Sequence, residues 1–194
     1  MAKRRPTKVQ DQRDPANKRS RILQTDIPSF SLTQAVRVPQ VVSDQFAGRP
    51  ATPLQVAQGL NVQPTSGPFR MLCGAASAYG LTEGGYNAER IALTAIGRRI
   101  VMPTQEGDDA RAIREALLKP RVIREFLQRY DQAKIPRDDI ARNVLAEMGV
   151  PRDSVDRTLK LIVDGAKTVG FVRELNGISY IDLQGTPVES QRPR

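Results

Sequence analysis

The chain has 194 residues, of which 39% are hydrophobic, and its formal net charge is +9 at pH 7. No apolar run approaches the roughly 20 residues of a membrane span, and the basic N-terminus lacks the apolar centre of a secretory signal, so we expect no membrane partner and no secretion. Histidine is absent, which removes the commonest general base and zinc ligand, and a single cysteine, Cys73, excludes an internal disulfide and a thiolate metal cluster. We therefore expect a cytoplasmic binding protein that is not an enzyme and uses no cofactor or metal.

Most of the excess charge lies near the N-terminus. Residues 1–21 carry eight Lys or Arg against two acidic residues, a net +6, whereas residues 22–188 carry 20 basic and 18 acidic residues, a net +2. A polar segment without periodicity predicts a disordered tail over residues 1–25. Such a tail contacts phosphates with little sequence preference, or it serves only for solubility. The tail cations expected to contact nucleic acid are Lys3, Arg4, Arg5 and Lys8.

The first expected helix covers about 32–46. Ser31 is positioned as its N-cap and Gln34 completes a capping box. Pro39 falls inside the helix, where a missing amide and a ring clash are expected to bend or divide it.

Two further helices are expected before a hairpin. One begins after the N-cap Thr52, with Gln55 at the capping-box position, and is expected to stop at Gly59. The next covers about 66–79 and ends before Gly80. Its apolar stripe consists of Phe69, Leu72, Cys73, Ala76 and Tyr79. Residues 81–83 and 90–93 then fit a β-hairpin with its tip at 84–87.

The same pattern returns after a shift of ninety residues without a gap. The aligned pairs are Gly59-Leu60 with Gly149-Val150, Phe69 with Leu159, Leu72 with Ile162, Ala76 with Ala166, and Gly80-Leu81 with Gly170-Phe171. We expect each aligned glycine to end a helix in the left-handed conformation. The second copy predicts helices over about 108–118, 121–130, 137–148 and 151–169, and a hairpin over 171–182. Asn176-Gly177 between apolar residues is a strong signal for a two-residue hairpin turn.

Helix, helix, turn, helix and hairpin is the element order of a winged helix. The segment Leu93-Thr94-x-x-Gly97-Arg98 after the first hairpin resembles the strand-to-helix junction of many bacterial winged-helix regulators. The chain as a whole resembles a bacterial family of tandem winged-helix modules without an assigned function. Some relatives of that type are joined to TIR-like or nucleoside-hydrolysing effectors in phage defence, so the resemblance implies a DNA-binding or adaptor module.

The predicted fold class is therefore mainly α with small β-hairpins (α+β), arranged as two tandem winged-helix domains. The expected boundaries are a basic tail over 1–25, a first unit over 26–106, a second unit over 107–183 and a flexible C-terminal tail over 184–194.

Winged helices usually contact DNA with the third helix in the major groove and the hairpin beside it. In the first unit this predicts nucleic-acid contacts by Ser66, Arg70, Ser77, Tyr86 and Arg90. In the second unit it predicts contacts by Arg157, Lys160, Lys167 and Arg173. The acidic residues Asp156 and Asp164 alternate with these cations and would repel phosphate, so a solvated face with an Asp156–Lys160 ion pair, or a protein contact, is an equal alternative.

Other charged and reactive residues favour structural roles. Asp138 and Asp139 fit the start of a helix better than a metal pair, and Cys73 fits a buried core thiol. Seven basic residues between the units are interleaved with acidic ones, which predicts a network of surface ion pairs. They are Arg98, Arg99, Arg111, Arg114, Lys119, Arg121 and Arg124.

The leading hypothesis is a protein that binds double-stranded DNA in transcription regulation or phage defence and associates with the bacterial nucleoid. The alternative is a protein-interaction adaptor or oligomerisation module that recruits or restrains a partner. A homo-oligomer is compatible with both hypotheses, because many winged-helix regulators bind two half-sites as dimers.

Overall fold

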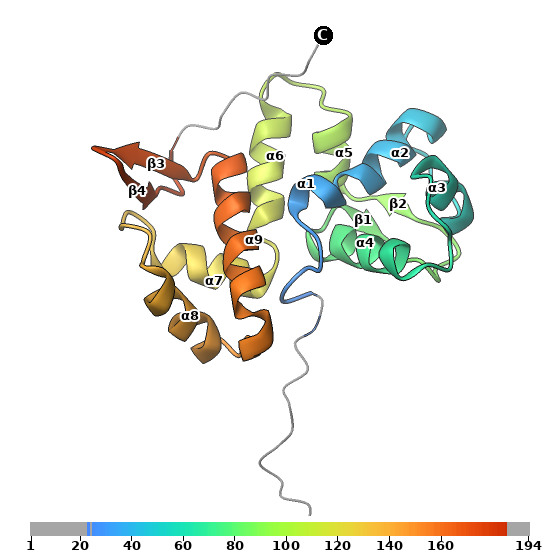
Figure 1. Ribbon diagram of the computed structural model, residues 1–194. Coiled ribbons are helices and arrows are strands. Elements are labelled where there is room, and N and C mark those ends of the chain that lie inside the picture. Colours follow the sequence, from blue (N-terminus) through green and yellow to red (C-terminus); the bar gives the residue numbers. More distant parts are fainter. Residues whose placement is uncertain (1–22, 24, 186–194) are drawn as a thin grey trace, which may run out of the picture.

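The computed structural model describes residues 23 and 25–185, so the tail cations Lys3, Arg4, Arg5 and Lys8 lie outside the described residues. The described chain is mainly helical with two small antiparallel sheets of two strands each, which confirms the α+β class (Figure 1). In chain order the elements are α1 (Leu32–Ala35), α2 (Arg37–Phe46), α3 (Pro53–Gly59), α4 (Gly67–Ala78), β1 (Thr82–Glu83), β2 (Ala92–Leu93), α5 (Ala95–Val101), α6 (Asp108–Leu117), α7 (Arg121–Arg129), α8 (Asp138–Glu147), the 3₁₀ turn η2 (Arg152–Ser154), α9 (Val155–Thr168), β3 (Val172–Leu175) and β4 (Ile178–Ile181).

The expected first helix is divided into α1 and α2. Both bonds of the capping box between Ser31 and Gln34 are present, which confirms the predicted start. The break lies at Val36, earlier than Pro39 itself. Pro39 has no amide to donate to the carbonyl of Ala35, and its ring would clash there, so the chain breaks in the turn before the proline. As the third residue of α2, Pro39 then needs no helical hydrogen bond.

The start of α3 was predicted correctly, but the reason for its end was not. Thr52 and Gln55 form the capping box. Gly59 is the last helical residue, and the left-handed residue that follows α3 is Asn61, with φ of 55°. A Cβ on Gly59 would lie 2.5 Å from Cγ1 of Val41, so this glycine instead lets α3 pack closely against α2.

Both predicted hairpins are present, and each gains a third backbone segment. In the first hairpin Thr82 pairs with Leu93, and Ala51 exchanges two hydrogen bonds with Ile91 at 2.8 and 3.0 Å. In the second, Leu175 pairs with Ile178 across a turn whose residues Asn176 and Gly177 have φ of 52° and 73°. Residues 131–135, between α7 and α8, bond to β4 in the way that Ala51 bonds beside β2.

The repeat is real in the third helices, but the gapless shift of ninety was wrong nearer the turns. Gly80 and Gly170 are left-handed and ninety residues apart, and the amides after them bond to the carbonyls of Ala76 and Ala166. The left-handed residues that follow α3 and α8 are instead Asn61 and Gly149, which are 88 residues apart. The difference arises because α9 has 14 residues and α4 has 12.

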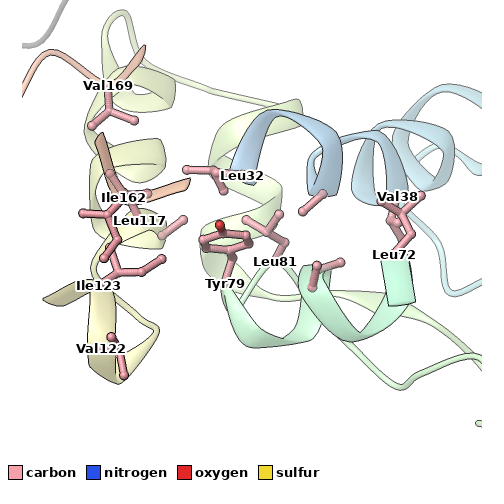
Figure 2. Packing of buried hydrophobic residues seen from close by; sticks show 14 of the residues in the cluster. Leu32, Val38, Leu72, Tyr79, Leu81, Leu117, Val122, Ile123, Ile162 and Val169 are labelled. Carbon is pink, nitrogen blue, oxygen red and sulfur yellow. The ribbon is translucent and has the colours of Figure 1, made fainter. Parts of the chain in front are cut away.

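One hydrophobic cluster crosses the predicted boundary between residues 106 and 107. Figure 2 shows Leu32 and Tyr79 of the first unit near Leu117 and Ile162 of the second. A Cβ on Gly165 of α9 would lie 2.9 Å from Leu117, so the two helices that flank this contact are closely packed. Because the two units share this cluster, the packing does not mark a boundary at residue 106, and the boundary stays a prediction.

Residues 26–30, which we call the strap, lie between the two units (Figure 1). On the side of the second unit, Asp26 pairs with Arg121 at 3.2 Å and accepts the amide of Val122 at 3.3 Å. Arg157 of α9 donates to the carbonyl of Ser29. On the side of the first unit, the hydroxyl of Tyr79 donates to the carbonyl of Phe30 at 3.2 Å.

The Thr94–Gly97–Arg98 junction joins the end of α4, the hairpin and α5. The Thr94 hydroxyl donates to the Gly80 carbonyl at 2.6 Å and accepts the Gly97 amide at 2.9 Å. A Cβ on Gly97 would lie 2.0 Å from the carbonyl oxygen of Leu81. Arg98 donates to the carbonyl of Gly48 at 3.1 Å, so the junction also holds the loop after α2.

We expect Gly97→Ala to lower the free energy of unfolding by about 1–3 kcal/mol, because the new methyl group meets a backbone carbonyl that cannot rotate away. Urea unfolding followed by circular dichroism measures this change. The matched control is Gly85→Ala, where the nearest atom beyond the chain neighbours is Oδ1 of Asn87 at 3.8 Å, an ordinary van der Waals distance from the new methyl group. That variant is expected to change the same free energy by less than about 0.5 kcal/mol. Equal stability of the two variants would show that α5 does not depend on this contact.

Candidate nucleic-acid interface

The exposed face of α4 and the loop between β1 and β2 form one surface in the first unit. The guanidinium carbon of Arg70 lies 4.7 Å from the centroid of the Tyr86 ring, within the range of a cation–π contact. The hydroxyl of Ser77 lies 3.5 Å from the carbonyl oxygen of Gly84. The structure thus brings together three residues that the sequence placed at this interface: Arg70, Ser77 and Tyr86.

Two other predicted contacts of the first unit take different positions. Ser66 is half-buried, and its hydroxyl accepts the amide of Phe69 at 3.3 Å, so its local role is to cap α4. The side chain of Arg90 is exposed, and its backbone carbonyl lies close to Gly84 on the opposite side of the hairpin. A Cβ on Gly84 would lie 2.2 Å from that carbonyl oxygen, which fixes a tight path for the loop.

The first unit carries arginines without carboxylate partners. No acidic residue occurs between Asp44 and Glu83, a stretch that includes all of α3 and α4. Among the described residues, no ion pair within 4 Å joins two side chains of residues 27–98. The arginines in that range are Arg37, Arg49, Arg70, Arg90 and Arg98. Arg70 is therefore available to an anion, apart from its contact with Tyr86.

The corresponding face of the second unit is largely committed to internal contacts. The expected Asp156–Lys160 pair was wrong, because Asp156 pairs with Arg142 of α8 at 2.5 Å. Arg157 donates to the strap. Arg173 lies 3.6 Å from Asp182. Lys160 and Lys167 are exposed on α9, as predicted, but Asp164 lies on the same exposed face.

The ion-pair network expected between the units is present in part: Arg99, Arg111, Lys119 and Arg121 pair with carboxylates, whereas Arg98, Arg114 and Arg124 donate to backbone carbonyls. Arg99 bonds both Asp108 at 2.9 Å and Glu115 at 2.8 Å, and Lys119 lies 3.8 Å from Glu115. Hydrogen bonds from Arg99 lower the pKa of the Asp108 carboxyl. Arg114 instead lies over the Phe171 ring at 4.4 Å and donates to the carbonyls of Gly170 and Gly185. These cations support the junction of the units and leave little free charge for a ligand.

Lys134 was not identified from the sequence as a site residue. It lies in the segment 131–135, which joins the second sheet through isolated bridges. Together with Lys167 of α9 it lines a groove beside β4. The signal in the sequence is weak, because Asp131-Gln132-Ala133-Lys134 lacks the alternation of a strand.

The cysteine and the acidic pair singled out in the sequence lie at the structural positions expected for them. Cys73 is buried in the core, and desolvation raises the pKa of its thiol to about 12. Asp138 and Asp139 lie in the first turn of α8, as predicted. Within the described residues, no group of three or more His, Cys, Asp or Glu side chains is arranged to hold a metal ion. The helices of that part of the chain include none that is long and apolar enough to cross a membrane.

No protein-family model, curated protein or solved structure matches this chain.

We expect Cys73 to remain unmodified when the native chain is treated with iodoacetamide at about pH 8, because the reactive thiolate is absent and the sulfur is buried. In urea the same cysteine is expected to react completely. Mass spectrometry gives a direct result, since the chain has a single cysteine. Native labelling at the rate seen in urea would mean that the core around α4 opens readily. Ionisation of Cys73 lowers the stability of the fold only as the pH rises from 9.0 towards 12. In that range the thiol of the unfolded chain has lost its proton, whereas the buried thiol of the folded chain still holds it.

Proposed function

We propose that the chain consists of two tandem winged-helix units and that its first unit binds duplex nucleic acid, most simply DNA. The order α2, α3, α4, β1 and β2, with Ala51 added beside β2, supports the first winged helix. The order α7, α8, α9, β3 and β4, with residues 131–135 added beside β4, supports the second. Fold alone does not establish a function, so the proposal depends on the surface of the first unit.

The observation that carries the proposal is the position of Arg70 on the exposed face of α4, beside the Tyr86 ring and on a stretch without carboxylates. Arg70 is the fourth residue of α4, and the first residues of such a helix are the ones that contact base edges. A guanidinium donates to the O6 and N7 atoms of guanine, or to phosphate oxygens. Stacking on Tyr86 restricts the arginine before binding, which reduces the entropy lost when it meets the ligand.

In this proposal α4 enters the major groove and the loop between β1 and β2 lies along the neighbouring backbone. Gly67 and Gly74 of α4 have no side chain that would hold the duplex away. The setting would be transcription regulation or a defence system, as the resemblance to tandem winged-helix modules implies.

A protein-interaction adaptor is the second candidate, and the second unit favours it. On α9 the carboxylates Asp156 and Asp164 are exposed, and Arg157 is bound to the strap. A phosphate backbone at this face would meet negative charge. The proposal therefore assigns nucleic-acid contacts on helical faces to α4 and not to α9.

Arg70→Ala is expected to weaken binding of a short DNA duplex by about 1–3 kcal/mol, that is roughly 5- to 150-fold in Kd. Fluorescence anisotropy at fixed salt measures the change. Tyr86→Ala is expected to weaken binding less, because it leaves the guanidinium in place but removes its support.

Arg37→Ala is the matched control for charge. Arg37 belongs to α2 of the same unit, is exposed and has no carboxylate within 4 Å among the described residues, but it lies outside α4 and the hairpin. Its removal is expected to leave Kd within about twofold, because it loses only a distant screened charge. If Arg37→Ala and Arg70→Ala weakened duplex binding equally, the loss would reflect the net charge of the chain and not a defined interface at α4. Failure of the full chain to bind any duplex would refute the proposed function.

A chain truncated to residues 23–194 is expected to bind the same duplex with a shallower dependence on salt. The slope of log K against log salt should decrease by roughly 0.9 for every tail cation that contacts a phosphate. Truncation at residue 23 retains the Leu23 carbonyl, which accepts the amide of Asp26 at 2.9 Å. An unchanged slope would leave the tail with a solubilising role only. Complete loss of binding on truncation would remove α4 from the interface.

A further inference from the structure

A groove in the second unit lies between α9, β4 and the segment 131–135. It has a volume of about 310 Å³ and is lined by Lys134, Ile135, Val163, Lys167, Gly177, Ile178 and Ser179. Ile135, Val163 and Ile178 are half-buried, whereas both lysines are exposed. The groove thus combines an apolar lining with two ammonium groups that reach solvent.

The positive charge of this groove has no carboxylate partner in the described part of the chain. No carboxylate belongs to its lining. Neither Lys134 nor Lys167 has an acidic partner within 4 Å among the described residues, although many arginines of the same unit are paired. Two exposed lysines beside an apolar surface complement a ligand that carries carboxylates next to an apolar group.

A nucleic-acid backbone fits this groove less well. Three of the four half-buried side chains that line it, Ile135, Val163 and Ile178, are aliphatic, so Ser179 is the one half-buried side chain of the lining that can donate to a phosphate oxygen. Asp164 is exposed on α9 within one turn of Lys167, so a long run of phosphates would also approach a carboxylate. A short peptide can place its few charges at the lysines and direct its apolar side chain to Val163 and Ile178. The volume is at the low end of the range for ligand pockets, which suits a short segment.

We propose that this groove binds a short peptide segment of a partner protein in which acidic residues flank an apolar one. The two lysines receive the carboxylates, and the three aliphatic side chains receive the apolar residue. This peptide site is separate from α4 and stands whether or not the first unit binds DNA. With the proposed function, it would make the chain a link between a nucleic acid and an acidic protein partner.

The experiment uses the isotope-labelled full chain and the synthetic peptide acetyl-Asp-Glu-Leu-Asp-Glu-Leu-amide, followed by NMR. We expect amide shifts concentrated at Lys134, Val163, Lys167 and Ile178. A variant with both Lys134→Glu and Lys167→Glu is expected to bind the peptide about tenfold or more weakly, because the two new carboxylates repel the acidic residues of the peptide. Its thermal unfolding should be unchanged, since both side chains are exposed.

Three comparisons make the test specific. Lys160→Glu changes the charge of α9 two helical turns before Lys167 and outside the lining of the groove, and it is expected to alter Kd by less than about twofold, because exposed charges about a Debye length apart are largely screened. A peptide with serine in place of leucine, and one with asparagine and glutamine in place of the acidic residues, should each bind more weakly than the parent peptide. Absence of shifts at the groove, or equal effects of Lys160→Glu and the double variant, would overturn the proposal. So would a DNA duplex that shifts the same four amides and displaces the peptide, because the groove would then be a phosphate site.

Discussion

The close approach of Gly97 to the Leu81 carbonyl determines how the first unit is assembled. Because no Cβ intervenes, the first turn of α5 lies directly against the chain that leaves α4. Thr94 fastens the same point through the Gly80 carbonyl, and Arg98 reaches the carbonyl of Gly48. These contacts join the residues just before β1 to the residues just after β2, and so they place the loop of the hairpin beside α4. The pairing of Arg70 with Tyr86 follows from that position.

The two units share an order of elements but differ in how their charges are used. Within residues 27–98 of the first unit, the arginines have no carboxylate within 4 Å among the described residues, and Arg98 bonds a backbone carbonyl. In the second, Asp156 bonds Arg142 across two helices, and Arg157 bonds the strap. The exposed faces of α4 and α9 therefore differ in charge, although the two helices follow the same order of elements. Because ion pairs hold cations that would otherwise be available, the same helix position serves different contacts in the two units.

The sequence was sufficient for features that depend on neighbouring residues. Both capping boxes, the Asn176-Gly177 turn and the stripe of α4 follow from local chemistry, and the structure has them. Gly59 was misjudged because its role depends on Val41, a residue of another helix.

The candidate sites show the same limit. Arg70 and Tyr86 were both expected at the interface, but their mutual contact was not, since it joins a helix to a loop. The Asp156–Lys160 pair was expected from helical spacing and lost to Arg142, a partner from a different helix. The groove at Lys134 depends on segment 131–135 lying beside β4, which no local pattern indicated.

The strap has a consequence for synthesis of the chain on the ribosome. Its bond from Arg121 to Asp26 spans 95 residues, and its bond from Arg157 to Ser29 spans 128. Domains generally fold in the order of their synthesis, so the first unit can form before these two partners have emerged. Until α7 and α9 leave the ribosome, Asp26 and Ser29 lack their bonds to Arg121 and Arg157, whereas the bond between Phe30 and Tyr79 can already form. Docking of the strap on α7 and α9 therefore follows the synthesis of both helices, and it joins the beginning of the described chain to a part that is made more than 90 residues later.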